Sequence, residues 1–399
     1  MNELADFGTV ILVVAGGFAL GVLSTKLGER VPVPAPAIFL VAAAVVSDIW
    51  PSIYGHVPIL TVERIAVVAL IVILFDGGID IGRRRFRAAA APILSLGILG
   101  TFATAGLLAL LAHYALGFDW TLAGLVGAAL APTDPAVMFS VLRGREIEGR
   151  SGTTLKGEAG VNDPAGIALM LGMVELATHD DASFLVVVRE FAVEMAVGTA
   201  AGLVGAAVLV PLLGRLRLPS PALYSVFPLA LAAALYGITS LAHGSGFLAV
   251  FIFGIFFADS AIPRRAETES FHSSLAGLSE LVVFVALGLT IQLGALEGRV
   301  WLEGIVLALF LAFAARPLVV AAALAGARLT RAEKLFIAWS GLKGAVPILL
   351  AAFALLGEAP GAEHVYGVVF VVVLASVLGQ GTLVPAVARR LRIPTTSVP

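Results

Sequence analysis

The chain has 399 residues, of which 59% are hydrophobic and 13% are charged, and its formal net charge at pH 7 is −2. Soluble domains carry about 25% charged residues, so this composition excludes an ordinary soluble protein and indicates one embedded in a lipid bilayer. The near-neutral charge gives no reason to expect nucleic acid as a partner. The absence of cysteine excludes disulfides and thiolate metal sites, and no cofactor is expected.

Apolar segments of roughly 17 to 25 residues, the length that crosses a bilayer, follow one another along the whole chain. They predict an all-α polytopic membrane protein with thirteen transmembrane helices, forming a single transmembrane domain over residues 1–399. Met1 to Gly8 lacks the basic region of a signal peptide, so the first span is expected to remain in the mature protein. The predicted spans are 7–27, 34–49, 60–81, 90–116, 120–142, 157–177, 184–213, 221–242, 246–259, 272–293, 301–326, 333–357 and 365–389.

The basic residues predict the orientation of these spans. If the N-terminus is outside, the loops after odd-numbered spans and the C-terminal tail are cytoplasmic, and they hold 20 of the 25 lysines and arginines. The largest cluster is Arg83, Arg84, Arg85 and Arg87. This bias follows the positive-inside rule, so we expect a multi-pass protein of the cell inner (plasma) membrane with its N-terminus outside and its C-terminus in the cytoplasm.

Two of the predicted spans contain helix breakers at matching places. Span five carries Ala131-Pro132-Thr133-Asp134-Pro135, and span twelve carries Gly341-Leu342-Lys343-Gly344-Ala345-Val346-Pro347. Proline removes a backbone donor, so both helices should unwind there, which a membrane tolerates only inside protein or beside a cavity. The two spans are seven apart and therefore oppositely oriented. This predicts a transporter built from two inverted repeats, approximately 7–177 and 221–389, with crossed broken helices.

The charged residues at the two breaks suit the ends of four half-helices. An acid is stabilised at positive helix N-termini and a base at negative C-termini, so Asp134 and Lys343 are expected to compensate the dipoles. Asp134 and Thr133 are candidates for direct ion contact, with Asn162 and Asp163 of the next span. Of the first two, Thr133 is the better candidate, because its hydroxyl and carbonyl are hard oxygen ligands.

The segment 157–177 is long enough to span the membrane, yet it carries Glu158 and the pair Asn162-Asp163. A carboxylate at membrane depth persists only where it pairs, faces a wet cavity or binds an ion. We therefore predict ion transport, with Asp163 as the main candidate. The alternative is an acid that only caps a half-helix.

Several motifs occur together in a fixed order. They are Leu74-Phe75-Asp76-Gly77-Gly78, Thr133-Asp134-Pro135, Glu158 with Asn162-Asp163-Pro164, Gly244-Ser245-Gly246-Phe247-Leu248-Ala249-Val250, and Trp339-Ser340-Gly341 through Pro347. In this combination the chain resembles the cation/proton antiporter-1 family of monovalent cation/proton exchangers.

The resemblance implies a thirteen-helix fold in a homodimer. The core domain would comprise the helices near 90–177 and 301–389, and the remaining helices would form the dimerisation scaffold. Asp163 would bind cation and proton in turn, and the neutral Asn162 implies electroneutral exchange. Glu158 would pair with Arg316. Ala159 stands where family members often have Ser.

Two further acids are secondary candidates. Asp76 precedes Gly77-Gly78 near the predicted inner end of the third span, where it is either a solvated helix end or a cavity-lining group. Glu280 matches an acid of eukaryotic exchangers and is expected to pair with a neighbouring helix.

The first function predicted from the sequence is exchange of Na⁺, or of Li⁺, for H⁺, with Asp163 and Thr133 binding the transported metal ion. The alternative is K⁺/H⁺ exchange, because the run Leu342 to Pro347 is similar to the bacterial branch associated with potassium and cell volume. An ion channel would need a selectivity filter, and an intramembrane enzyme would need a nucleophile–base pair or a metal motif. Neither is visible in the sequence, so we expect a transporter and no enzyme.

Overall fold

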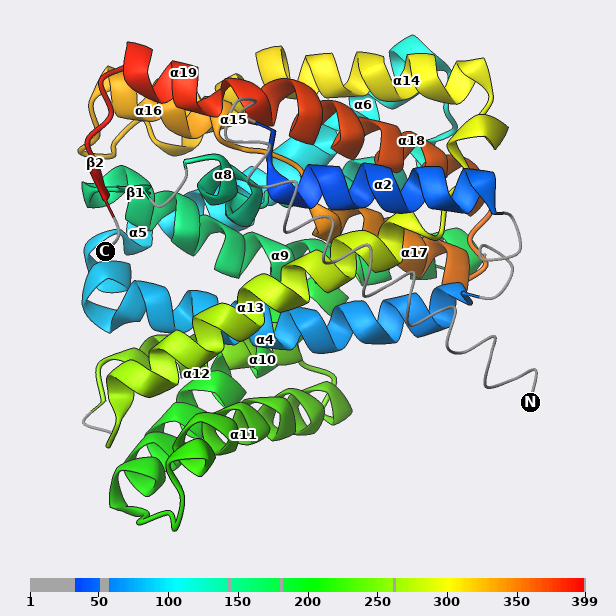
Figure 1. Cartoon of the computed structure of the whole chain (residues 1–399). Helices are drawn as coiled ribbons and strands as arrows, with labels where there is room; N and C mark the ends of the chain where they lie inside the picture. Colours follow the sequence, from blue (N-terminus) through cyan, green and yellow to red (C-terminus); the bar gives the residue numbers. More distant parts are fainter. Residues whose placement is uncertain (1–32, 51–56, 143–144, 180–181, 261–262, 398–399) are drawn as a thin grey trace.

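The computed structural model describes residues 33–50, 57–142, 145–179, 182–260 and 263–397. The predicted first span, 7–27, lies outside these residues. The described part is helical except for one short two-stranded sheet (Figure 1). Its α-helices are α2 (Ala35–Ile49), α4 (Ile59–Ala88), α5 (Ala90–Leu94), α6 (Thr101–Leu116), α7 (Trp120–Ala129), α8 (Pro135–Val141), α9 (Gly149–Thr178), α10 (Phe184–Arg215), α11 (Pro221–Leu241), α12 (Gly246–Ala258), α13 (Arg265–Gly288), α14 (Gly298–Phe310), α15 (Arg316–Ala323), α16 (Arg331–Trp339), α17 (Ala345–Leu356), α18 (Ala362–Ala375) and α19 (Thr382–Arg390).

Seven helices in the described part are long and apolar enough to cross a membrane, and four shorter apolar helices accompany them. Helix α9 is not among the seven, because Glu158, Asn162 and Asp163 interrupt its apolar run. All but the first of the predicted spans coincide with helical segments of the structure. The all-helical membrane architecture predicted from the sequence is therefore confirmed for the described residues.

Helix boundaries differ from the predictions at the basic cluster. The third span was predicted to end at residue 81, but α4 continues to Ala88 beyond a kink at Gly82, where φ is 64°. Glycine adopts this left-handed conformation without steric cost, so the helix changes direction there and resumes. The arginines of residues 83–87 thus form a helical turn and not a loop.

Three long helices contain π-helical segments. These are η2 (Ser95–Gly100) between α5 and α6, η4 (Leu311–Ala315) before α15, and η5 (Ser376–Gly381) between α18 and α19. Such segments are rare and are frequently found at functional sites. Three short elements complete the described part of the fold: the 3₁₀ helix η3 (Leu293–Ala295), and the antiparallel strands β1 (Arg145–Ile147) and β2 (Thr395–Ser397).

Both predicted breaks are confirmed. Span five divides into α7 and α8, and span twelve divides into α16 and α17. Side-chain caps stabilise the start of the first half of each broken helix. Asp119 accepts a hydrogen bond from the backbone N–H of Leu122 at the start of α7, and Thr330 and Glu333 form a capping box at the start of α16.

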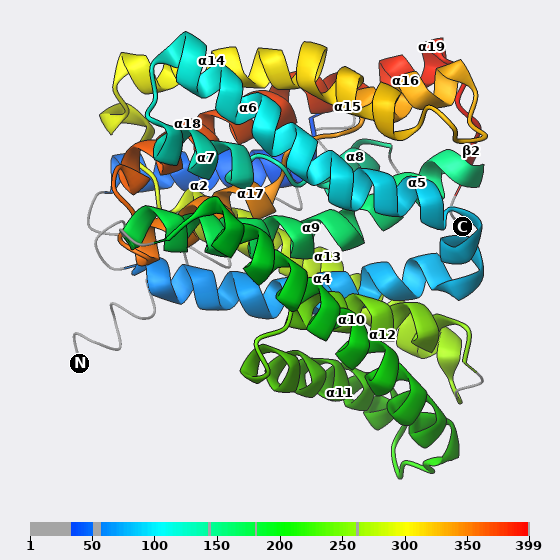
Figure 2. The same cartoon turned by 180° about the vertical axis from the view of Figure 1, so that it is seen from behind.

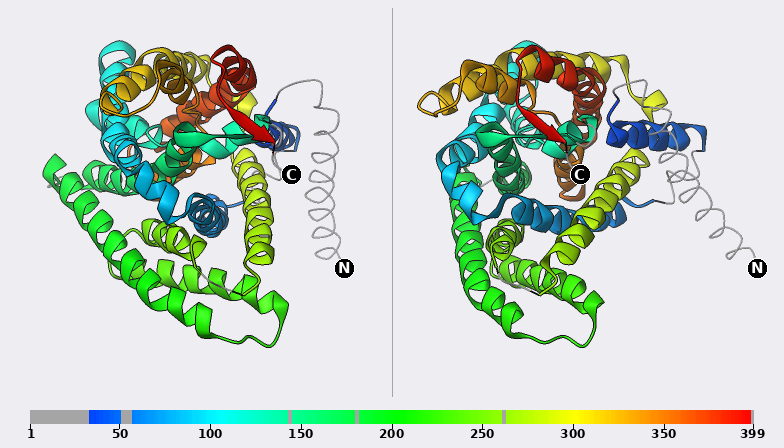
Figure 3. Two further views of the ribbon diagram at one scale, coloured as in Figure 1. Left: turned by 90° about the vertical axis from the view of Figure 1, so that its left-hand side faces the viewer. Right: turned by 60° about the vertical axis from the view of Figure 1, so that its left-hand side comes forward.

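The helices fall on two sides of α4 and α9. Helices α10, α11 and α12 lie at one side, and α14, α15, α16, α18 and α19 lie at the other (Figures 1 and 2). Helices α9 and α17 lie between these two groups, and α13 runs on the side of the bundle opposite to α10 (Figures 1 and 3). Packed segments bury α9 from Gly157 to Met170, so Glu158 and Asp163 lie in the interior of the protein.

Candidate functional site

The two broken helices meet through their backbones. The N–H of Asp134, in the first break, donates a 2.8 Å hydrogen bond to the carbonyl of Leu342, in the second break. The unwound residues are buried, and each break satisfies part of the polar backbone of the other. The non-helical segments therefore persist inside the membrane at low cost.

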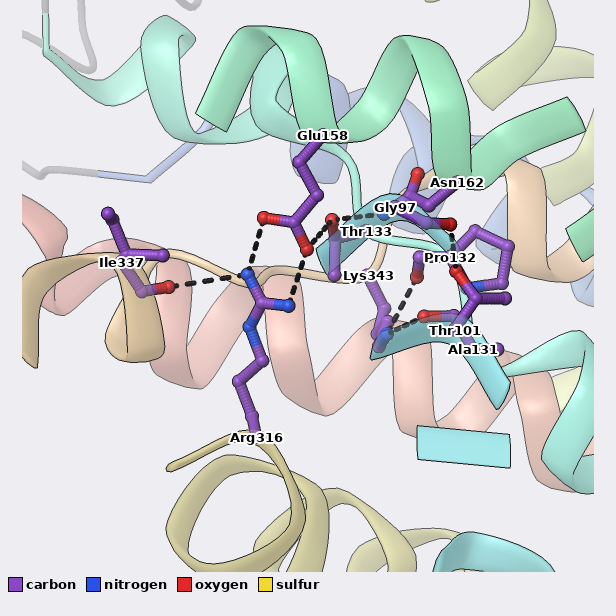
Figure 4. A network of polar contacts seen from close by, with 10 residues as sticks. All are labelled: Gly97, Thr101, Ala131, Pro132, Thr133, Glu158, Asn162, Arg316, Ile337 and Lys343. Atoms are coloured by element: carbon purple, nitrogen blue, oxygen red, sulfur yellow. Dashed lines mark hydrogen bonds and ion pairs between the residues drawn. The ribbon is translucent and has the colours of Figure 1, made fainter. Parts of the chain in front are cut away.

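The base at the crossing caps the end of a half-helix. Lys343 is fully buried, and its Nζ donates hydrogen bonds to the carbonyls of Ala131 at 3.0 Å and Pro132 at 2.6 Å (Figure 4). These carbonyls follow the C-terminus of α7, where the helix dipole is negative. This is the arrangement that the sequence predicts for Lys343.

The acid at the crossing lies at the other kind of helix end. The Asp134 carboxylate sits directly against Gly344, the residue that precedes α17, so closely that a side chain at Gly344 would overlap Oδ2. The positive N-terminus of α17 thus faces a carboxylate. Glycine is required at position 344 because it leaves room for this approach.

A buried ion pair joins α9 to α15. Arg316 Nη1 and Nη2 donate to Glu158 Oε1 at 2.5 Å and to Oε2 at 2.8 Å, and the two side chains are only 3% and 1% exposed (Figure 4). The guanidinium also packs on Gly341, which has no side chain to obstruct it. The predicted contact between Glu158 and Arg316 is therefore present in bidentate form, which is the strongest geometry for such a pair.

Thr133 and Asn162 extend this network and do not line the space around Asp163. The amide of Asn162 donates to Thr133 Oγ1 at 2.8 Å, and Thr133 Oγ1 donates to Glu158 Oε1 at 3.5 Å (Figure 4). The Thr133 hydroxyl is thus already bonded to two side chains. Ala159, also on α9, is buried as well.

Asp163 lines a small cavity of about 40 Å³. The side chain is 6% exposed, and its Oδ1 has no hydrogen-bond partner among the described residues. A buried carboxylate oxygen without a partner requires an explanation, because such groups are normally satisfied by protein, water or an ion. The cavity has room for an ion with one or two waters. It is lined by Ala66, Leu70, Ile73, Asp134, Asp163, Glu280, Val283, Ala345, Val346 and Leu349.

Glu280 lines the same cavity from α13. It is expected from the sequence to pair with a neighbouring helix, and the structure places it in the Asp163 cavity, together with Asp134. Glu280 Oε1 has no hydrogen-bond partner in the described part of the chain. The sequence could not show this, because α13 reaches α9 only through the packing of the whole bundle.

The three acids do not form a metal-binding cluster. In the described residues, no three histidine or acidic side chains converge closely enough to hold one metal ion.

Asp76 lies apart from this cavity. It is half-buried within α4, two turns before the kink at Gly82, and shares a charged neighbourhood with Asp80, Lys156 and Glu269. Lys156, on α9, forms a 2.5 Å ion pair with Asp80. The structure thus favours a charged cluster between α4 and α9 over a solvated helix end.

Sequence reasoning missed two residues that hold the second break. Ser376 Oγ accepts a 2.9 Å hydrogen bond from the backbone N–H of Lys343, and Gln380 Nε2 donates to the carbonyl of Trp339 at 2.5 Å. Both belong to the π-helical segment η5. Polar side chains in an otherwise apolar helix were the available signal for them.

The comparisons with known proteins identify the family. A family model described as "Sodium/hydrogen exchanger, transmembrane" matches residues 10–390. The chain belongs to this sodium/hydrogen exchanger family. Among curated members, it is 34% identical to the "K(+)/H(+) antiporter NhaP" of Alkalimonas amylolytica, over 98% of this chain and 68% of that protein. It is 31% identical to "K(+)/H(+) antiporter NhaP2" of Shewanella sp. (strain ANA-3), over 96% of this chain and 67% of that protein.

A second group of similar exchangers carries a different ion in its name. The chain is 26% identical to "Na(+)/H(+) antiporter 1" of Methanocaldococcus jannaschii, over 83% of this chain and 80% of that protein. The solved structure of the sodium proton antiporter MjNhaP1 from the same organism matches with a TM-score of 0.78 and 22% identity, covering 98% of this chain and 99% of that one. This exchanger therefore has the fold of MjNhaP1.

Proposed function

We propose that this exchanger moves one monovalent cation against one proton, with Asp163 binding either of them. The observation that carries the proposal is the cavity around Asp163, where one carboxylate oxygen has no partner among the described residues. Cation and proton would compete for the same carboxylate, so each must leave Asp163 before the other binds.

Of the two acids of α9 near the crossing, Asp163 is the one whose charge is left free to change. Glu158 is compensated by Arg316, and Lys343 is held by the carbonyls of the first break. Asn162 is neutral and donates its amide to Thr133. Since only one carboxylate of α9 then gains and loses a cation, we propose electroneutral exchange.

Alternating access is supported by where the cavity lies. Residues of α4 and α13 line one wall, and residues of α9, α17 and the first break line the other. We propose that the second group belongs to the moving core, approximately 90–177 and 301–389, and the first to the scaffold. Sliding at this seam would open Asp163 to each side of the membrane in turn.

We also propose the finer architecture that the sequence predicts. It comprises thirteen spans in two inverted repeats, a homodimer, and a plasma-membrane location with the N-terminus outside. The opposed broken helices and the distribution of arginine and lysine support this arrangement. The activity would be transport without enzymatic chemistry.

The comparisons change the order of the candidate cations. From the sequence alone Na⁺ came first, but the relatives with 34% and 31% identity are named K⁺/H⁺ antiporters. We therefore propose K⁺ as the first candidate. Na⁺ is the second, because the M. jannaschii protein named a Na⁺/H⁺ antiporter matches most of the chain.

The test uses purified protein in proteoliposomes that contain a pH-sensitive dye. K⁺, Na⁺, Li⁺ and choline are added in turn, with and without a voltage clamp. We expect proton movement driven by K⁺ and insensitive to voltage, and no movement in Asp163→Asn. Asp119→Asn is the matched control, since asparagine caps a helix as well as aspartate does. Retained exchange in Asp163→Asn would refute the role of Asp163, and a response to Na⁺ alone would identify the second candidate.

A further inference from the structure

A second and larger hollow lies on a different face of α9 from the ion cavity, because Val161 and Asp163 are two residues apart and point about 200° apart around the helix. It is a groove of about 350 Å³ between the end of α4, α5 with η2, α9, α10 and α12. Val161 and Phe251 form its apolar floor, and Leu94, Ile98 and Leu203 form its walls. Its volume falls in the range of pockets that bind small organic ligands.

The groove opens toward the surroundings of the protein. Leu94 is 43% exposed and Leu203 is 46% exposed, and both line it. In a bilayer these side chains face acyl chains. The groove is thus accessible sideways from the lipid phase.

Two arginines define the chemistry of one end. Arg83 and Arg87 line the groove and are one helical turn apart on the segment of α4 that follows the Gly82 kink. Both are exposed, and neither forms an ion pair with an acidic side chain of the described residues. The guanidinium of Arg83 lies 5.8 Å from the ring centroid of Phe256, which holds it at the mouth of the groove.

An apolar groove with two arginines at its end matches an anionic lipid. Arginine binds phosphate through two parallel N–H groups, and basic pockets between transmembrane helices recognise anionic head groups. The arginines also belong to the cluster that the charge distribution assigns to the cytoplasmic side. We propose that this groove binds one anionic phospholipid of the cytoplasmic leaflet, with its phosphate between Arg83 and Arg87 and an acyl chain along Val161 and Phe251.

The site joins the two groups of helices between which the ion cavity lies. Val161 is two residues before Asp163, and the ring of Phe251 packs directly on Gly160. A lipid in the groove would touch both α9 and α12. It follows, if the proposed exchange is correct, that this lipid restrains movement of α9. Lipid binding itself does not depend on that exchange and is measured without it.

The head-group test uses native mass spectrometry of the purified protein in mild detergent. Phosphatidylglycerol and phosphatidylcholine with identical acyl chains are titrated separately. We expect one phosphatidylglycerol to bind more tightly than phosphatidylcholine, and Arg83→Ala/Arg87→Ala to weaken phosphatidylglycerol binding roughly tenfold or more. Arg264→Ala/Arg265→Ala is the matched control, because it removes two exposed arginines elsewhere and should bind like the parent.

The acyl-chain test blocks the groove with a bulky side chain and leaves both arginines in place. Leu203→Trp places a large ring in the groove and should reduce phosphatidylglycerol binding, whereas Val204→Trp, on the neighbouring face of α10 and 63% exposed, should not. Any of three results would overturn the proposal. They are equal binding of the two lipids, unchanged phosphatidylglycerol binding in Arg83→Ala/Arg87→Ala, and equal phosphatidylglycerol binding in the two tryptophan variants. Retained exchange in Asp163→Asn, which would refute the role of Asp163, leaves these binding measurements unaffected, so the two proposals fail separately.

Discussion

Replacing Arg316 with alanine should destabilise the protein strongly. Arg316 makes a bidentate pair with Glu158, and the side chains are 3% and 1% exposed. Without the guanidinium, a carboxylate remains buried with only the Thr133 hydroxyl 3.5 Å from one of its oxygens. Breaking a buried pair from one side costs about 3–5 kcal/mol.

The assay is thermal unfolding of the purified protein in detergent. At about 1.5 °C per kcal/mol, extrapolated from smaller domains to this length, the melting temperature should fall by about 5–8 °C. Arg265→Ala serves as the control, because its pair with Glu269 is exposed on both sides and contributes at most about 1 kcal/mol.

A double variant separates the pair from the packing around it. In Glu158→Gln/Arg316→Met both charges are removed, so most of the lost stability should return. If Arg316→Ala melts with the parent, the pair does not stabilise the fold. The decrease in melting temperature of the double variant is compared with the sum of the decreases in Glu158→Gln and Arg316→Met. If the two are equal, the stability is lost through packing and not through an unpaired charge.

Two further predictions concern the crossing and the ion cavity. Gly344→Ala should lower stability by about 1–3 kcal/mol and slow exchange, because the added methyl overlaps the Asp134 carboxylate. Gly77→Ala, where the methyl meets nothing within 4 Å, is the control, and equal melting temperatures and rates in both variants would contradict the close approach. If cation and proton compete for Asp163, the half-saturating cation concentration measured in proteoliposomes should rise as pH falls, approaching tenfold per pH unit. A half-saturating concentration that stays constant from pH 5 to 9 would exclude such competition.

The local chemistry of the chain predicted the features that depend on neighbouring residues. Prolines and glycines located both helix breaks, and the isolated charges Asp134 and Lys343 indicated which helix ends they would occupy. Features that depend on packing between distant segments could not be predicted in this way. Glu280 reaches the Asp163 cavity from α13, and Ser376 reaches the second break from η5, through contacts that no sequence pattern encodes.

The resemblance to the antiporter family suggested the Glu158–Arg316 contact, but not how the rest of the network is arranged. Asn162 was singled out for its neutrality. Its amide in fact bridges from α9 to Thr133 in the first break. Asn162 therefore connects α9 to the first break, a structural role that its lack of charge did not predict.

The small sheet has a practical consequence for measuring motion. Strand β2, at the end of the described chain, pairs residue by residue with β1, and the N–H of Glu148 donates a 3.0 Å hydrogen bond to the carbonyl of Pro394 just before α9 begins. The C-terminal residues are thereby anchored to the helix that carries Asp163. A fluorophore placed next to β2 would therefore move with α9. Its distance to a second dye on α11 would report movement of α9 relative to α11 during transport, without a label near the ion.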